Sequence, residues 1–203
     1  CLLFPLMNVG PLLFVAGVGL MIAMFAGRWA PRLWLGATVV GAGAALGAAV
    51  CVLAGGTEWD WRSGFEVSGE RLHLRLDNIS AVFVALLGVV GGLGTVYARE
   101  YWADEAHPRS ARSGRVWWSA LVASIGVVLL SSNGLHFLIA WEIFAVASYF
   151  LITLERRKSE VRAAGWLYLS ASHAATLCLF AYFAILAART GSWELGPMRE
   201  HTE

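Results

Sequence analysis

The sequence predicts an all-α membrane protein, a polytopic bundle of about six transmembrane helices with one short β-hairpin. Of the 203 residues, 58% are apolar and 14% are charged, and the mean hydropathy is +0.64. Soluble domains are about 45–50% apolar and about 25% charged. The charged residues also gather in clusters, separated by apolar stretches of about 20 residues, the length that crosses the hydrocarbon core of a bilayer.

Six segments are long and apolar enough to be transmembrane helices. The first also resembles a signal peptide in length, but no basic residues precede it and five more apolar segments follow, so we predict a true span. A short turn at Ser131-Ser132-Asn133-Gly134 separates the fourth segment from the fifth. The expected spans are Leu3–Ala26, Leu33–Ala54, Ile79–Ala98, Val116–Leu130, Leu135–Leu154 and Ala163–Ala188.

The connection between the second and third spans, Gly55–Asp77, predicts a β-hairpin. Apolar and polar residues alternate on both sides of Ser68 and Gly69, as expected for two short strands joined by a tight turn. Trp59 and Trp61 precede this pattern, and tryptophan is favoured at the headgroup level of a bilayer. We therefore expect the hairpin to lie on the membrane surface.

The distribution of Lys and Arg predicts the orientation in the membrane. With six spans, ten of the 15 basic residues fall in one set of connections and five in the other. The positive-inside rule places the larger set in the cytoplasm, so the N-terminus, the hairpin and the C-terminal segment are expected outside the inner (plasma) membrane. The larger set contains Arg28, Arg32, Arg99, Arg109, Arg112, Arg115, Arg156, Arg157, Lys158 and Arg162, and the smaller contains Arg62, Arg71, Arg75, Arg189 and Arg199.

Glycines four residues apart indicate where helices pack closely. Gly43 and Gly47 form one such pair, and Gly88 and Gly92 form another. Small residues at this spacing let helix backbones approach each other in lipid. We interpret both pairs as packing positions.

Glu142 is an ionisable residue deep inside the expected fifth span. It lies about eight residues into the helix, or roughly 12 Å along it, close to the middle of the bilayer. An ionised carboxylate costs several kcal/mol there unless it is paired, protonated or reached by water. One interpretation is an ion pair that holds two helices together. The other, which we favour, is a proton or ion carrier, because burial lets a carboxyl group load and release a proton near neutral pH.

His173 is the second candidate, about ten residues into the sixth span. Ser170 and Thr176 lie three residues to either side, so the three residues form a polar stripe on one broad helical face. Histidine titrates near neutral pH and suits a proton relay, but it also serves as a hydrogen-bonded core residue in helix bundles. Tyr149 follows Glu142 by seven residues on the same face, where it is placed to give polar support.

The sequence contains few signals for other chemistry. Cys1, Cys51 and Cys178 are far apart, which predicts no metal or redox site. There is no P-loop, dinucleotide-binding fingerprint, HExxH motif or nucleophile elbow. The net charge of +1 gives no indication of a nucleic-acid partner. We expect no cofactor and no catalytic redox site in this chain, whose enzymatic status stays open, and the lipid bilayer as its first partner.

Most of the chain resembles the antiporter-like membrane subunits of respiratory complex I, related hydrogenases and Mrp sodium/proton antiporters. The motifs that carry the resemblance of residues 133–195 are WEIFAVASYFLI at Trp141–Ile152, AGWLYLSASHAATL at Ala164–Leu177 and TGSWEL at Thr190–Leu195. Upstream, Leu74–Tyr101 resembles the span that follows the family's periplasmic hairpin. The histidine beside an alanine in span six favours the branch of hydrogenase-4 or formate hydrogenlyase component B.

The resemblance implies roles that the residues alone do not give. It implies that Glu142 pairs with a lysine of a seventh span, and that changes in this pair move protons through a half-channel. His173 stands at the matching position of span six. It also implies that this is the N-terminal fragment of a longer subunit. Residues 1–115 then hold three spans and the hairpin (about 55–77), and 116–203 begin an antiporter-like repeat that stops before span seven.

The expected function is that of a membrane subunit in a proton-translocating oxidoreductase complex. The complex is expected to be of the hydrogenase-4/formate hydrogenlyase or NADH-quinone oxidoreductase type. The expected partners are other membrane subunits and, indirectly, a soluble redox arm. Two alternatives stay open: a sodium/proton antiporter subunit of Mrp type, and a membrane scaffold that transports nothing.

Overall fold

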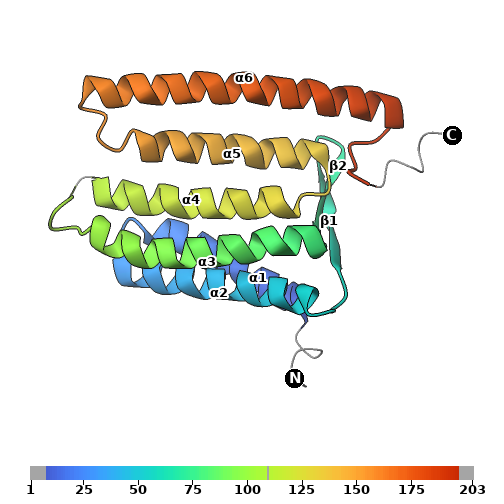
Figure 1. Ribbon diagram of the computed structural model, residues 1–203, viewed down its shortest axis with the longest axis horizontal. Helices are drawn as coiled ribbons and strands as arrows, with labels where there is room; N and C mark the ends of the chain where they lie inside the picture. The colour runs from blue at the N-terminus through green and yellow to red at the C-terminus, as the bar shows by residue number, and fades with distance from the viewer. Residues whose placement is uncertain (1–7, 109, 197–203) are drawn as a thin grey trace.

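The computed structural model describes residues 8–108 and 110–196. Within these residues, six helices are long and apolar enough to cross a membrane, and two strands form a hairpin. The helices run side by side, and the hairpin lies across one end of the bundle (Figure 1). The predicted all-α membrane bundle is confirmed at this level. The helices are α1 (Val9–Ala26), α2 (Pro31–Leu53), α3 (Asn78–Tyr101), α4 (Ser110–Leu130), α5 (Gly134–Ile152) and α6 (Ser159–Thr190).

The helix bounds follow the predicted spans with two informative differences. The fourth helix begins at Ser110 and not at Val116, because the arginines that precede the apolar run are good helix formers and extend α4 beyond it. The sixth helix has 32 residues, or about 48 Å, which exceeds the ~30 Å hydrocarbon core. The predicted start of the first span at Leu3 lies outside the described residues.

Close packing among the first three helices depends on glycine. A Cβ atom at Gly19 of α1 would lie 2.9 Å from the carbonyl oxygen of Ala37 and 3.1 Å from the Cα atom of Gly41. A Cβ atom at Gly88 of α3 would lie 2.9 Å from the carbonyl oxygen of Ala42. The prediction for Gly88 is therefore confirmed. The prediction for Gly43 is wrong, because no atom of residues 8–108 and 110–196 lies within 4 Å of its Cβ position, and the contact face of α2 passes through Gly41 instead.

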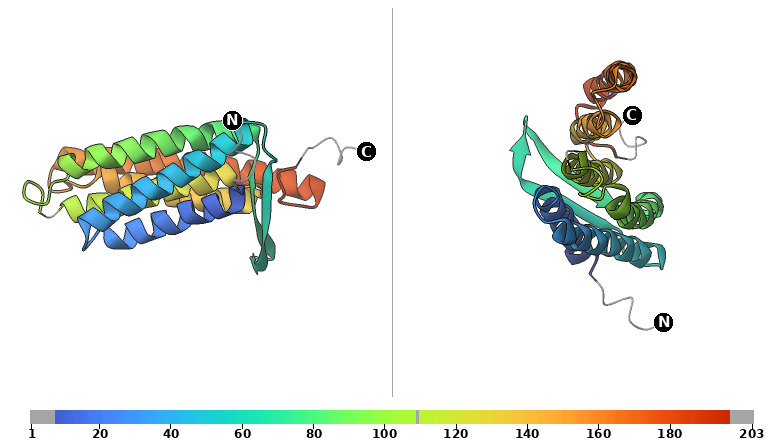
Figure 2. Two further views of the ribbon diagram at one scale, coloured as in Figure 1. Left: turned by 90° about the horizontal axis from the view of Figure 1, so that it is seen from below. Right: turned by 90° about the vertical axis from the view of Figure 1, so that its left-hand side faces the viewer.

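Helix α6 lies at the edge of the bundle, beside α5 (Figures 1 and 2). Only Gly165 and Phe183 of this helix are buried. Gly165 has no room for a side chain, since a Cβ atom there would lie 2.3 Å from Cγ2 of Thr153. The α5–α6 contact is thus specific, while most of the α6 surface is free of contacts with the described residues.

The predicted hairpin is present and consists of β1 (Trp59–Val67) and β2 (Glu70–Leu76), paired antiparallel. The turn residues Ser68 and Gly69 both have positive φ values, 57° and 83°, as the tight turns of two-residue hairpins require. A bulge interrupts the pairing between Arg62 and Glu66. There the Ser63 hydroxyl accepts a hydrogen bond from the backbone N–H of Leu72 at 3.0 Å, which replaces a missing ladder contact.

Backbone hydrogen bonds join the hairpin to the other segments at the same end of the bundle. The N–H of Ser132, in the turn between α4 and α5, donates to the carbonyl of His73. The N–H of Leu195, beyond α6, donates to the carbonyl of Ser132, and that of Gly134 donates to the carbonyl of Trp193. We call this the hairpin end. Three segments distant in sequence are therefore held together there.

The opposite end carries the described members of the larger basic set, and we call it the basic end. Arg115 differs from the others because it is only 3% exposed. Its Nε donates to the carbonyl of Gly27 at 2.9 Å, and its Nη2 lies 3.0 Å from the Asp104 carboxylate. The other described arginines of this set are exposed. Arg115, in contrast, contacts both the α1–α2 connection at Gly27 and the α3–α4 connection at Asp104.

Candidate functional site

Glu142 and His173 face each other across the α5–α6 contact. Glu142 is the ninth of the 19 residues of α5, at the middle of the helix. The distance from its Oε2 to Nε2 of His173 is 3.6 Å. The two residues that the sequence singled out are therefore neighbours, although they come from separate helices.

A hydrogen bond to the helix backbone orients the ring of His173. Its Nδ1 lies 2.9 Å from the carbonyl oxygen of Leu169, one turn earlier in α6. A carbonyl only accepts, so Nδ1 carries a proton and Nε2 faces the carboxyl group. The two side chains therefore face each other through Oε2 of Glu142 and Nε2 of His173.

His173 faces only one of the two carboxylate oxygens of Glu142. Its Oε1 is buried and has no hydrogen-bond partner among the described residues, and the same holds for Nε1 of the adjacent Trp141. Unpaired buried polar atoms are costly, and more so in a bilayer than in water. Each of these two atoms therefore suits a further polar group or water.

The remaining residues of the predicted site contribute less. In the part of the chain that the structure describes, Tyr149 makes no hydrogen bond to Glu142, and its ring packs against Gly165. The Thr176 hydroxyl donates to the backbone carbonyl of Ser172 within α6. Ser170 is exposed. Within the described residues, none of these three side chains hydrogen-bonds to the side chain of Glu142 or His173.

His136 is a titratable residue that the sequence patterns did not single out. It lies in the first turn of α5, six residues before Glu142, and is 6% exposed. Neither ring nitrogen has a hydrogen-bond partner among residues 8–108 and 110–196. A histidine inside an apolar span was the signal available in the sequence, and it was the same signal that identified His173.

A second cluster lies at the hairpin end, centred on His73 of β2. His73 is 6% exposed, with Nε2 2.8 Å from Oδ2 of Asp60 and Nδ1 bonded to Glu194. Arg62 lies 3.6 Å from the same Glu194 carboxylate. The sequence could not predict this cluster, because Glu194 follows α6 and only the fold brings it to β2.

Charge pairs also brace the exposed part of the hairpin. Nη2 of Arg75 lies 2.5 Å from the Glu58 carboxylate. The pKa of Arg75 is raised above its ordinary value, chiefly by this hydrogen bond. Asn133 completes the junction, with its amide donating to Glu70 and its Oδ1 accepting from the first backbone N–H groups of α5. Within the described residues, no three His, Cys, Asp or Glu side chains are arranged to hold a metal ion.

Comparison with known proteins gives relatives of one kind. No family model matches the sequence. Hydrogenase-4 component B of Escherichia coli K12 is 24% identical over 128 residues, 63% of this chain and 19% of that protein. An uncharacterised protein of Mycobacterium tuberculosis is 29% identical over 124 residues, 60% of this chain and 18% of that protein. A probable K⁺/H⁺ antiporter subunit of Rhizobium meliloti is 28% identical over 127 residues, 63% of this chain and 12% of that protein.

A solved structure shares the fold. A chain of the membrane-bound sulfane sulfur reductase, an archaeal respiratory membrane complex, superposes with a TM-score of 0.66 at 22% identity. The superposition covers 93% of this chain and 29% of that chain. The present chain spans between 12% and 19% of the length of the curated relatives above. These homologues are consistent with the antiporter-like membrane subunits that the sequence motifs resemble.

Proposed function

We propose that this chain is part of a proton-translocating membrane subunit of an oxidoreductase complex, of the hydrogenase-4/formate hydrogenlyase or NADH-quinone oxidoreductase type. In this proposal Glu142 carries the proton through a half-channel, and His173 exchanges it. The observation that supports it most directly is the 3.6 Å pair between these residues at the middle of two adjacent apolar helices. The relatives among respiratory and antiporter membrane subunits support the class of complex.

The proposed proton step needs little movement. At 3.6 Å, Nε2 of His173 and Oε2 of Glu142 are slightly beyond direct hydrogen-bonding distance, so one water or a small side-chain rotation connects them. A cation that approaches the unpaired Oε1 of Glu142 favours the carboxylate and sends the proton to His173. We propose that a lysine from another helix of the complete subunit supplies that cation.

The proposed orientation places the basic end in the cytoplasm and the hairpin end outside the inner membrane. The support is the asymmetry of Lys and Arg between the two sets of connections. In this orientation α1 begins outside and α6 ends outside. We further propose that other membrane subunits pack against the exposed side of the bundle and that a soluble redox arm acts on it indirectly.

A second candidate is a cation/proton antiporter subunit of Mrp type. The specific observation in its favour is the similarity to a probable K⁺/H⁺ antiporter subunit. The two candidates differ in what drives proton movement. Proton uptake driven by electron transfer favours the oxidoreductase subunit, and uptake driven by an imposed Na⁺ or K⁺ gradient favours the antiporter.

The decisive test replaces Glu142 by Gln in the full-length subunit within its complex. Proton uptake into inverted membrane vesicles is followed with a pH-sensitive dye while electron transfer is measured in parallel. We expect proton uptake to fall by at least about tenfold, since an isosteric amide keeps the shape of the side chain but cannot bind and release a proton. Assembly is expected to stay intact.

Glu160→Gln is the matched control, because it makes the same chemical change in the exposed first turn of α6. Its proton uptake should equal that of the unaltered protein. Normal proton uptake by the Glu142→Gln variant would contradict the carrier role and favour the non-transporting scaffold. If fewer complexes assemble but each assembled complex still pumps normally, the result would favour a purely structural ion pair.

A further inference from the structure

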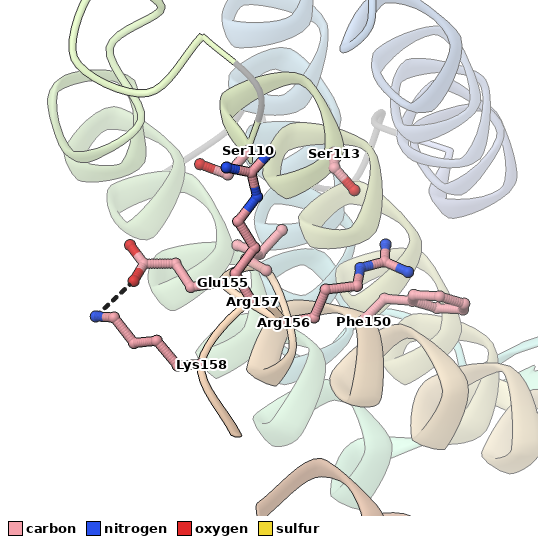
Figure 3. Close-up of a pocket in the computed structure, with 8 residues that line it drawn as sticks. Ser110, Ser113, Phe150, Glu155, Arg156, Arg157 and Lys158 are labelled. Atoms are coloured by element: carbon pink, nitrogen blue, oxygen red, sulfur yellow. Dashed lines mark ion pairs between the residues drawn. The ribbon is translucent and has the colours of Figure 1, made fainter. Parts of the chain in front are cut away.

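Two adjoining grooves open at the basic end of the bundle. The first, of about 550 Å³, lies between the start of α4 and the connection from α5 to α6 (Figure 3). The second, of about 450 Å³, lies between the α1–α2 connection, α4 and α5. Ser113, Phe150 and Arg156 line both, so the two form one continuous depression. It lies at the ends of the helices, where we expect lipid headgroups to meet the hydrocarbon core if these helices span a bilayer.

Unpaired positive charge lines the second groove. Arg28, Arg112 and Arg156 come from three different segments, and all three are exposed. None of them is in an ion pair with a carboxylate of the described residues. Three arginines that line one groove without counter-ions among the described residues favour the binding of an anion there.

The single carboxylate that lines the first groove does not cancel this charge. Glu155 is paired with Lys158 at 2.9 Å, as the dashed line in Figure 3 marks. The hydrogen bond and the charge of Lys158 hold the pKa of Glu155 below its usual value, while the pKa of Lys158 is raised in return. Figure 3 also shows Arg156 directed toward Phe150 and Arg157 directed toward the start of α4.

Aromatic side chains form the apolar wall beside these arginines. Trp117 and Phe150 stack with ring centroids 4.2 Å apart and planes 11° apart. Trp29 lines the same groove and is 80% exposed. Tryptophan at this depth is typical of the membrane interface, where its ring contacts both headgroups and acyl chains. The groove thus offers cations for phosphate and an adjacent apolar surface for an acyl chain.

We propose that this arginine groove, formed by Arg28, Arg112 and Arg156 with Trp29, Trp117 and Phe150, binds the headgroup of a diphosphate phospholipid of the cardiolipin class. A diphosphate headgroup brings two negative charges to the three arginine charges of the groove, whereas the headgroup phosphate of an ordinary phospholipid brings one. Basic pockets between transmembrane helices at the cytoplasmic side bind such headgroups. The site is independent of proton transfer by Glu142, and it rests on the proposed orientation that places the basic end in the cytoplasm.

The test compares two double variants of the full-length subunit in its complex. One replaces Arg28 and Arg112 by Gln. The matched control replaces Arg32 and Arg99 by Gln, which removes the same charge from the same end without changing a residue that lines either groove. The purified complexes in mild detergent are titrated with tetraoleoyl cardiolipin, and bound lipid is counted by native mass spectrometry.

We expect the groove variant to bind cardiolipin at least about tenfold more weakly, since basic residues attract anionic lipid headgroups. The control variant should bind within about twofold of the unaltered complex, because exposed charges outside the groove are screened by salt. Replacement of Arg28 and Arg112 by Lys should give an intermediate loss, since lysine keeps the charge but not the bidentate geometry. Phosphatidylcholine should show no difference among the complexes.

Three results would overturn the proposal. Equal weakening in both Gln variants would mean diffuse attraction to the basic end. Full displacement of the lipid by inorganic phosphate or pyrophosphate at low concentration would point to a soluble anion as the occupant. Loss of a partner subunit from the groove variant, with cardiolipin binding unchanged, would assign the groove to an acidic protein segment. Thermal unfolding of each complex verifies that the variants remain folded.

Discussion

The imidazole of His73 in β2 hydrogen-bonds through Nδ1 to the carboxylate of Glu194, 121 residues later in the chain. The same ring faces Asp60 through Nε2 at 2.8 Å. Each ring nitrogen therefore lies beside a carboxylate oxygen. Arg62 adds a second positive charge beside Glu194. The cluster therefore joins β1, β2 and the segment after α6 through one buried side chain.

Replacement of Glu194 by Gln is expected to destabilise the protein. The change removes the charge that pairs with His73 and Arg62 and replaces hydrogen bonds to a carboxylate by weaker neutral ones, at a cost of about 1–3 kcal/mol. The midpoint of thermal unfolding in detergent, followed by tryptophan fluorescence, should fall by several degrees. Glu66→Gln is the control, because among the described residues Glu66 pairs only with the exposed Arg71. Equal shifts in both variants would contradict a special role for the His73 cluster.

Alanine substitutions at two glycines should have opposite effects. Gly88→Ala places a Cβ atom 2.9 Å from the Ala42 carbonyl oxygen and forces α2 and α3 apart, which typically costs about 1–3 kcal/mol. Gly43→Ala meets no atom within 4 Å in the part of the chain that the structure describes and removes an unfavourable helix residue, a gain of about 0.5–1 kcal/mol. Thermal unfolding midpoints of the two variants measure the difference. A stable Gly88→Ala protein would show that the helices separate at little cost.

Labelling of single cysteines tests the proposed orientation. With the native cysteines replaced, Ser68→Cys at the hairpin tip should react with a membrane-impermeant maleimide on intact cells. Ser159, at the start of α6, is also exposed to solvent but lies at the basic end. A cysteine at this position should therefore react only after the cells are permeabilised. The reverse pattern would invert the assignment of the two ends.

His173→Ala is expected to reduce proton uptake less than Glu142→Gln does. Glu142 retains its own exchangeable proton when His173 is absent, and water fills part of the space that the imidazole occupied. Proton uptake measured across a pH series should shift its optimum, since a titratable partner has been removed. Loss of assembly without any change in the pH optimum would indicate that His173 has only a packing role.

The sequence predicted the helices well because membrane helices require long apolar stretches, and such stretches are visible without any knowledge of the fold. The prediction of the hairpin depended on alternation around Ser68 and Gly69, and the positive φ values of these residues explain why a serine and a glycine occupy the turn. The strand β1 begins at Trp59, before the alternation starts, because pairing with β2 extends it.

The candidate site was only partly predictable. Glu142 and His173 stand out because ionisable residues are rare at mid-span, and this signal needs no partner. The contacts of His73 with Glu194, and of Arg115 with Gly27, join segments far apart in sequence. No periodicity indicates such pairs. The sequence also pointed to Gly43 where the structure uses Gly41 as the contact position. The rotation of α2 about its axis depends on the neighbouring helices, which the sequence pattern does not reveal.

The junction at the hairpin end also constrains the order in which the protein matures. The ribosome adds Glu194 121 residues after His73. At about 5–20 residues per second, this interval lasts roughly 6–24 s. During that time four helices, α3 to α6, must be made and inserted before the imidazole acquires its second carboxylate. Closure of the junction therefore follows the synthesis of α3 to α6, and it occurs only in chains whose sixth helix has already reached its place.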